Sequence, residues 1–223
     1  MIQNTEQLVN QLKNADPQKR FGAILELTSF HLPLFEGSDG EKRRSKAIEE
    51  LKQLRASLAT LPLIEILSYD SYNMNRAMAA RALGDYGDPR AIEPLRNCLD
   101  DNDFEVLCSA ISALGRLRDE NSVHRILSFL DQSHDKWIRI EAIHALSNLH
   151  YLPAEINFRE LLKDSDHIVR YEAMLGFLAL SRHKGQKLKA DLVRFLSDPY
   201  EPNRYLAQKW LEIIEEEERE GKS

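Results

Sequence analysis

The chain has 223 residues, of which 43% are hydrophobic and 30% charged, and its formal net charge at pH 7 is −6. This acidic balance argues against a dedicated nucleic-acid binder, because such a protein uses lysine and arginine to neutralise phosphates. No apolar run approaches the roughly 18 residues of a membrane span, and the N-terminus lacks the pattern of a secretion signal, so we expect a cytoplasmic protein that binds neither nucleic acid nor membrane.

Residues 1–31 are predicted to form a divergent first helical hairpin. Leu8 and Leu12 mark its first helix, Asp16 and Pro17 its turn, and the apolar residues around Ala23 its second helix. Residues 32–57 follow as a predicted insertion. Its front half carries loop signals, and its back half has leucines at helical spacing, which predict an added helix that runs into Pro62.

The stretch 76–103 is the unit that the rest of the chain repeats. It is predicted to be a helix, a tight turn and a second helix, with Gly84 and Gly87 ending the first helix and Asp88 and Pro89 starting the next. Such a pair of helices has one apolar side and cannot bury it alone. It must therefore stack on copies of itself.

The copies are visible as a column of alanines 31, 32, 31 and 34 residues apart: Ala79, Ala110, Ala142, Ala173 and Ala207. Several further columns keep the same period, which is the signature of a repeat architecture. We predict an all-α fold, an α-solenoid of about five to six stacked helical hairpins. It forms a single domain over 1–223, with regular repeats over 58–214 and an acidic tail over 215–223.

The pattern Arg-x-x-Ala-x-x-Ala-Leu-Gly at 76–84, followed by Gly-Asp-Pro-Arg-Ala-Ile-Glu-Pro-Leu at 87–95, resembles the HEAT repeat. More narrowly, it is similar to the HEAT-like repeats of phycobilisome bilin lyase subunits and their relatives. The resemblance implies an α-solenoid whose relatives attach or detach bilins or act as scaffolds.

An aspartate stands six residues before an arginine in three repeats, at Asp70 and Arg76, at 164 and 170, and at 198 and 204. These steps are similar to the ladder that joins neighbouring HEAT repeats by charge-assisted hydrogen bonds. A row of anion-binding arginines is the alternative. The ladder pattern breaks at Leu107, where a leucine replaces the arginine.

Several catalytic and metal sites are excluded by the residues present. A HEAT-fold hydroxylase binds its di-iron centre with His-Glu pairs, whereas the matching pairs here are Ile140-Glu141 and Tyr171-Glu172. The sequence has no phosphate-binding glycine loop, no zinc spacing of cysteines and no local nucleophile motif. We therefore predict a non-catalytic protein with no metal and no resident cofactor.

A binding groove is predicted on the second helix of each hairpin, which lines the concave face of a HEAT array. Positions two before and two after the alanine column should point outward. They are expected to be polar if they only face water, yet several are apolar. The outward positions and their neighbours that make up the candidate groove are Arg81, Cys108, Ser112, Trp137, Ile140, Glu141, His144, Tyr171, Leu175, Tyr205 and Lys209.

Two interpretations of this strip remain open. The side chains either form a binding surface, or strong curvature buries them against neighbouring repeats. Glu141 and His144 lie three residues apart on one helix, where they either contact a ligand or form an ordinary surface pair.

Our leading hypothesis is a scaffold that binds a protein partner in the groove. The alternative, implied by the resemblance, is a bilin lyase subunit or a phycobilisome-turnover factor. In that case aromatic side chains stack on a tetrapyrrole, Arg81 or Lys209 pairs with its propionates, and a second HEAT-repeat subunit or a phycobiliprotein is the partner.

Overall fold

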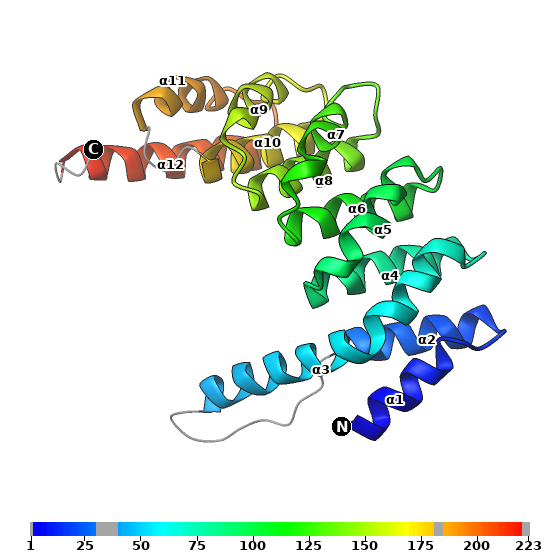
Figure 1. Ribbon diagram of the computed structural model, residues 1–223. Helices are drawn as coiled ribbons and strands as arrows, with labels where there is room; N and C mark the ends of the chain where they lie inside the picture. Colours follow the sequence, from blue (N-terminus) through cyan, green and yellow to red (C-terminus); the bar gives the residue numbers. More distant parts are fainter. Residues whose placement is uncertain (1, 30–39, 181–184, 220–223) are drawn as a thin grey trace. The chain divides into compact units, whose positions relative to one another are not determined.

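The structure is a computed structural model that describes residues 2–29, 40–180 and 185–219 (Figure 1). Every regular element in these ranges is a helix. The α-helices are α1 (Ile2–Gln11), α2 (Pro17–Thr28), α3 (Gly40–Tyr69), α4 (Asn73–Tyr86), α5 (Ile92–Asn97), α6 (Phe104–Arg116), α7 (Val123–Ser128), α8 (Lys136–Asn148), α9 (Glu155–Leu161), α10 (His167–Leu180), α11 (Gly185–Phe195) and α12 (Glu201–Arg219). Short 3₁₀ turns lie at Pro89–Ala91, Cys98–Asp100, Glu120–Ser122 and Leu152–Ala154.

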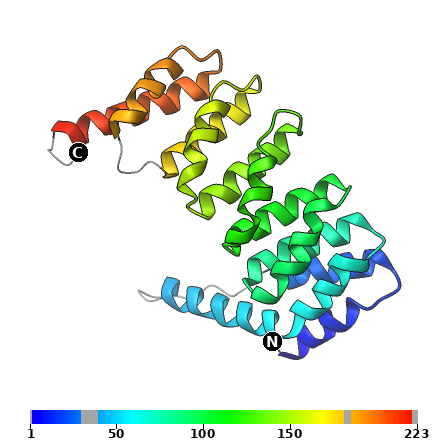
Figure 2. The ribbon, with the colours of Figure 1, turned by 45° about the horizontal axis from the view of Figure 1, so that its top comes forward.

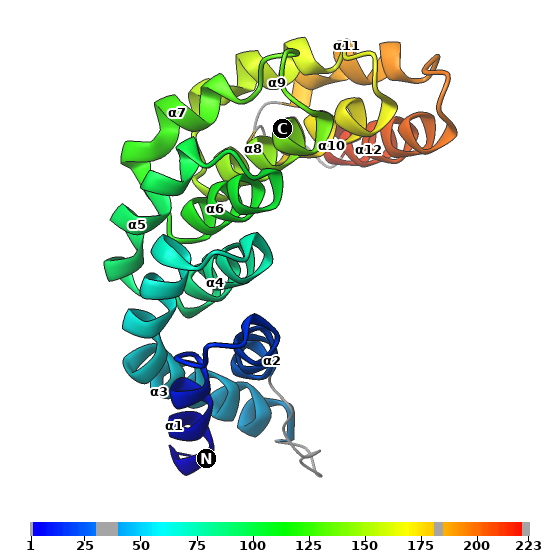
Figure 3. The ribbon, with the colours of Figure 1, turned by 90° about the vertical axis from the view of Figure 1, so that its right-hand side faces the viewer.

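These helices form six successive hairpins, which confirms the predicted all-α solenoid of stacked hairpins. The described residues of 1–122 and of 123–223 pack as two compact units, called unit 1 and unit 2 below. Within unit 2, the first helices α7, α9 and α11 form one layer and the second helices α8, α10 and α12 another (Figure 3). Figure 2 shows the pairing clearly for α11 (orange) alongside α12 (orange to red).

The alanine column belongs to the buried core of the second helices. Ala79, Ala110, Ala142, Ala173 and Ala207 are all fully buried. A methyl group lets two helices approach closely while still removing apolar surface from water. The column that appeared in the sequence as a repeat is therefore part of the core in the five hairpins that contain it.

Two predicted helix ends are wrong. Gly84 lies inside α4, where a Cβ atom would come within 2.7 Å of the Ala113 Cβ on α6, so this glycine permits close helix packing. Only Gly87, with φ of 72°, ends the helix. Pro62 lies within the continuous helix α3. A proline inside a helix costs one backbone hydrogen bond, and Ala59, Leu63 and other buried side chains of α3 hold the helix against its neighbours across this point.

The predicted insertion is thus joined to the next repeat. Residues 32–39 lie outside the described residues, and residues 40–57 form the first part of α3. Arg55 fixes this part to the first hairpin, because its Nη1 donates to the carbonyl oxygens of Leu27 and, at 2.7 Å, Ser29 at the end of α2. A guanidinium is favourable at a helix C-terminus, where the carbonyl groups have no partner within the helix.

The Asp–Arg ladder is present, and its geometry is more specific than the six-residue spacing suggested. Each ladder aspartate first shapes its own turn: the carboxylate of Asp198, for example, accepts the N–H of Tyr200 at 2.9 Å. It also accepts two hydrogen bonds, at 2.8 and 2.9 Å, from Arg170 of the preceding repeat. Arg170 in turn donates to the backbone carbonyl of Asp164, six residues earlier, at 2.9 Å.

The carboxylate contacts therefore join neighbouring repeats, and the six-residue spacing reflects a backbone contact within one repeat. The inter-repeat pairs are Arg20–Asp70, Arg76–Asp101, Arg139–Asp164 and Arg170–Asp198. Because Arg76 and Arg170, two of the three arginines of the predicted row, are paired with carboxylates, the alternative of an anion-binding row is not supported. Leu107 has no donor to offer, so its repeat contributes no arginine to the ladder.

Candidate binding surface

The second helices of unit 2 carry most of the predicted groove residues. We call this region the α8–α10–α12 surface and define it by Trp137, Glu141, His144, Tyr171, Glu172, Leu175, Tyr205 and Lys209. The order of the helices is set by contacts of α10 with α8 on one side and α12 on the other. Arg81, Cys108 and Ser112 belong to unit 1 and are described separately below.

Trp137 stands in the first turn of α8. The carboxylate of Asp135 caps this helix by accepting the N–H of Trp137 at 2.8 Å. The indole is 48% exposed, although its size would normally favour burial. The Nζ of Lys136 lies 5.4 Å from the ring centroid and 3.1 Å from the Asp166 carboxylate on the next repeat, so the indole lies beside a fixed cation.

The next two helices add further apolar groups. On α10, Leu175 is 36% exposed and Tyr171, one turn earlier, is half-buried. On α12, Tyr205 is 63% exposed. The Lys209 Nζ lies 5.8 Å from the Tyr205 ring centroid and 2.8 Å from the Glu212 carboxylate. Each second helix of unit 2 therefore presents at least one large apolar side chain to water.

His144 pairs with a different residue from the one predicted. Its Nε2 lies 2.9 Å from Glu172 on α10, whereas Glu141, its predicted partner on the same helix, makes no hydrogen bond to it. The hydrogen bond to Glu172 raises the pKa of His144 above its ordinary value, against the effect of burial, and the charges of Glu172 and Glu141 add to the rise. The pair joins two repeats and places one ion pair within the aromatic surface.

The predicted exposure of Ile140 is wrong, because this side chain is only 4% exposed. Ile140 lies one turn before His144 and therefore points to the same side of α8, toward α10. On that side α10 packs against α8 and covers Ile140, whereas the side chain of His144 extends to Glu172 at the surface of α10. Tyr205 occupies the equivalent position on α12, and no further helix follows in the described part of the chain.

The unit 1 residues of the predicted groove have a different character. Arg81 is exposed, Cys108 and Ser112 are half-buried, and Ala77, at the position equivalent to Ile140, is buried. The Ser112 hydroxyl and the Arg81 carbonyl both accept hydrogen bonds from Arg116, at 3.2 and 3.3 Å. The exposed aromatic side chains of the prediction thus all lie in unit 2.

The α8–α10–α12 surface is suited to binding. It offers aromatic and aliphatic side chains next to a histidine, a lysine and carboxylates, which can give both apolar contact and orientation. Within the described ranges, no three histidine, cysteine or carboxylate side chains gather as a metal site would require, and no helix has the length and hydropathy of a membrane span. Sequence reasoning missed Lys136 and the role of Glu172, because their partners, Asp166 and His144, lie on neighbouring repeats.

The paired helices, the buried alanine column and the ladder define an α-solenoid repeat protein. A family model for HEAT repeats matches residues 32–107, 60–147 and 92–175, which together cover more than half of the chain. The chain therefore belongs to the HEAT-repeat family.

Solved structures share this fold. The complex of CpcE and CpcF of phycocyanin lyase from Nostoc sp. PCC7120 is similar with a TM-score of 0.63 and 23% identity, over 94% of this chain and 76% of that one. An engineered protein of the Northeast Structural Genomics Consortium is similar with a TM-score of 0.61 and 20% identity, over 95% of this chain and 96% of the other. A search of curated proteins finds no match.

Proposed function

We propose that the protein is a non-catalytic HEAT-repeat adaptor that binds a protein partner on the α8–α10–α12 surface. The observation that carries this proposal is the exposure of Trp137, Leu175 and Tyr205 on three consecutive second helices. Large apolar side chains gathered on a soluble protein commonly mark an interaction site, and tryptophan and tyrosine are among the residues that contribute most to binding energy.

The test compares Trp137→Ala and Tyr205→Ala with Ile156→Ala. Ile156 is a suitable control because it is 74% exposed but lies on α9, in the first-helix layer. A partner recovered by affinity purification is purified, and its dissociation constant is measured by calorimetry against each variant. We expect each aromatic substitution to weaken binding by about 2 kcal/mol, or about thirtyfold, and Ile156→Ala to leave it unchanged.

The proposal fails if the two aromatic variants bind like the unsubstituted protein, or if Ile156→Ala weakens binding as much as they do. Melting temperatures are measured alongside. Because both aromatic side chains are exposed, their loss should change stability little, so a large fall in melting temperature would assign them to the core instead.

A second candidate is a bilin-binding role, as a lyase subunit or a phycobilisome-turnover factor. It is supported by the fold likeness to the CpcE–CpcF complex and by aromatic rings that a planar tetrapyrrole could stack on. Under this candidate, Lys209 pairs with a propionate, which must compete with Glu212 for the ammonium group. A second HEAT-repeat chain would then be the expected partner.

Absorption spectroscopy separates the two candidates. The purified protein is mixed with a bilin, with and without a second lyase subunit and an apo-phycobiliprotein. A shifted spectrum that Tyr205→Ala abolishes would support bilin binding. An unchanged spectrum with no transfer of the pigment would exclude it and leave the protein-binding proposal standing.

A further inference from the structure

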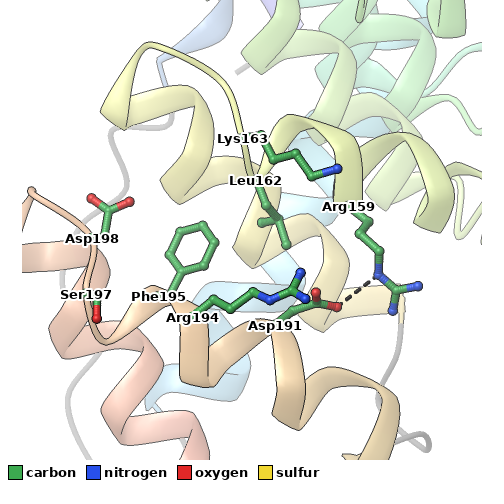
Figure 4. A pocket seen from close by; sticks show the side chains of 8 residues that line it. All are labelled: Arg159, Leu162, Lys163, Asp191, Arg194, Phe195, Ser197 and Asp198. Carbon is green, nitrogen blue, oxygen red and sulfur yellow. Dashed lines mark hydrogen bonds and ion pairs between the residues drawn. The ribbon is translucent and has the colours of Figure 1, made fainter.

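A pocket of 230 Å³ lies between α9 and α11, in the first-helix layer of unit 2 and apart from the α8–α10–α12 surface (Figure 4). No motif of the sequence pointed to it. Its lining consists of Arg159, Leu162, Lys163, Asp191, Arg194, Phe195, Ser197 and Asp198.

The floor of the pocket is apolar. Leu162 follows α9 and Phe195 ends α11, and both side chains are largely buried. In Figure 4 they lie next to each other between the charged groups of the two helices. This floor can hold an aliphatic chain or an aromatic ring.

Arg159 is fixed at one side of the pocket. Its guanidinium lies over the ring of Phe177, 5.1 Å from the centroid, and its Nε donates to Asp191 at 2.9 Å, the contact drawn in Figure 4. The carboxylate of Asp191 is therefore already paired. The Nη2 of Arg159 also lies 4.0 Å from the carboxylate of Glu155 on the same helix.

The second carboxylate of the lining is also paired. Both oxygens of Asp198 accept hydrogen bonds from the ladder arginine Arg170, and the Tyr200 N–H adds a third bond. Each of the two carboxylates of the lining is thus already paired with an arginine.

Two cations and a hydroxyl remain at the opening. Arg194 has no acceptor among the residues that the structure describes, and the Ser197 hydroxyl likewise makes no hydrogen bond to them. Within the described ranges, Lys163 pairs with Glu160 alone, in a contact whose two side chains are 67% and 68% exposed. Such an exposed pair is weak and easily exchanged. The pocket therefore combines an apolar floor with cationic and hydroxyl donors that make no buried contact among the described residues.

The charge of this lining distinguishes it from two other pockets of the described chain. Pockets of 640 and 750 Å³ lie between the α1–α2 turn and α3 and between α7 and α9. In both of them carboxylates equal or outnumber the lysine and arginine side chains, and both are wider. Stacking of first helices explains why such pockets recur, but it does not explain the excess of cations in the α9–α11 pocket.

We propose that the α9–α11 pocket binds a small apolar group that ends in a carboxylate. Leu162 and Phe195 hold the apolar part, Arg194 donates to the carboxylate, and Lys163 adds a second charge at the rim. The pocket is smaller than a site for a drug-sized ligand, so the ligand is a single ring or a short chain. It is either a free carboxylic acid or the last residue of a peptide with a free C-terminus.

The test uses the full chain and two matched probe pairs, observed by NMR titration. One pair is 3-phenylpropionate and its neutral amide. The other is the peptide Ala-Ala-Phe with a free or an amidated C-terminus. We expect saturable shifts of signals from residues around Leu162 and Phe195 with an acid probe, and binding at least about tenfold weaker for the matching amide.

Variants assign the donor. Arg194→Gln should weaken binding of the acid by about tenfold and leave the amide unchanged, whereas Lys19→Gln, on the exposed part of α2, should change neither. Arg194 is exposed, so its variant is expected to fold, and circular dichroism checks this. Binding of the free acid alone identifies a metabolite-like ligand, and binding of the peptide alone identifies a peptide C-terminus. Equal binding of acid and amide, shifts away from the pocket, or an Arg194→Gln variant that binds the acid unchanged would overturn the proposal.

Discussion

A guanidinium and a carboxylate can be buried together only when each replaces the hydrogen bonds that the other loses with water. Arg170 and Asp198 meet this condition, because two hydrogen bonds join them and the remaining lone pairs and N–H groups contact backbone. Burial alone would raise the pKa of Asp198, but the bonds from Arg170, Tyr200 and Asn203 outweigh it and hold that pKa below its ordinary value.

We predict that Arg170→Gln lowers the free energy of unfolding by about 2–3 kcal/mol at pH 7, because it leaves a buried carboxylate without its cation. A folded-state pKa below the unfolded value of about 3.9 stabilises the protein above that pH, and this contribution is lost as the pH falls through the folded-state pKa. The difference in the free energy of unfolding between Arg170→Gln and the unsubstituted protein should therefore become smaller below about pH 4. Urea unfolding at pH 7 and pH 3.5 measures it.

Arg90→Gln serves as the control for this prediction. Arg90 also pairs with an aspartate, Asp88, but its side chain is half exposed, so we expect little change in stability at either pH. Equal effects of the two substitutions would contradict the assignment of the ladder as a buried, stabilising contact.

His144 provides the second prediction at this scale. Its folded-state pKa is raised, chiefly by the hydrogen bond to Glu172, so its contribution to stability is fully present below the unfolded pKa of about 6.5 and is lost as the pH rises through the folded-state value. An NMR titration should show the pKa of His144 falling in Glu172→Gln. Glu141→Gln should lower it less, since Glu141 contributes only through its charge. If Glu141→Gln lowered the pKa of His144 more than Glu172→Gln did, the pairing of His144 with Glu141 on the same helix would be supported instead.

At the scale of the helices, the space around each helical glycine indicates how closely the neighbouring helices pack. In α10, a Cβ atom at Gly176 would come within 2.8 Å of Ile143 on α8 and 2.9 Å of Phe158 on α9, so this helix has no room for a methyl group. In α2, a Cβ atom at Gly22 would meet nothing within 4 Å. The two helical glycines thus differ only in their surroundings.

We predict opposite signs for the two alanine substitutions. Gly176→Ala should destabilise the protein by about 1–3 kcal/mol through overpacking, reduced by the better helix propensity of alanine. Gly22→Ala should stabilise it by up to about 1 kcal/mol, because only the propensity changes. Chemical denaturation of both variants tests this, and stabilisation by Gly176→Ala would show that α8, α9 and α10 are less tightly packed than described.

The length of α3 could not be predicted from local signals. Pro62 is an ordinary sign of a helix end, and the sequence around it does not reveal that buried neighbours hold the helix on both sides. The same holds for Gly84: a glycine is an ordinary sign of a helix end, but this one lies inside α4 and permits close packing against α6. The helix propensity of a single residue does not decide where a helix ends when packing against neighbouring helices contributes more free energy.

For the molecule as a whole, the repeat predicted the hairpins and the ladder, because period and residue type are properties of the chain itself. The candidate surface was predicted only in part. Trp137, Leu175 and Tyr205 are exposed as expected, but exposure of Ile140 depends on how far a neighbouring helix extends, and the partner of His144 lies 28 residues away. The α9–α11 pocket is formed by side chains of two repeats, and no periodic pattern in the sequence predicts it.

The ladder also has a direction. Every guanidinium comes earlier in the chain than its carboxylate, by 50 residues for Arg20 and by 25 to 28 for Arg76, Arg139 and Arg170. A ribosome makes the chain from its N-terminus, so each ladder arginine is synthesised before its aspartate. Each of these four ion pairs can therefore form only after the repeat that supplies the aspartate has been translated.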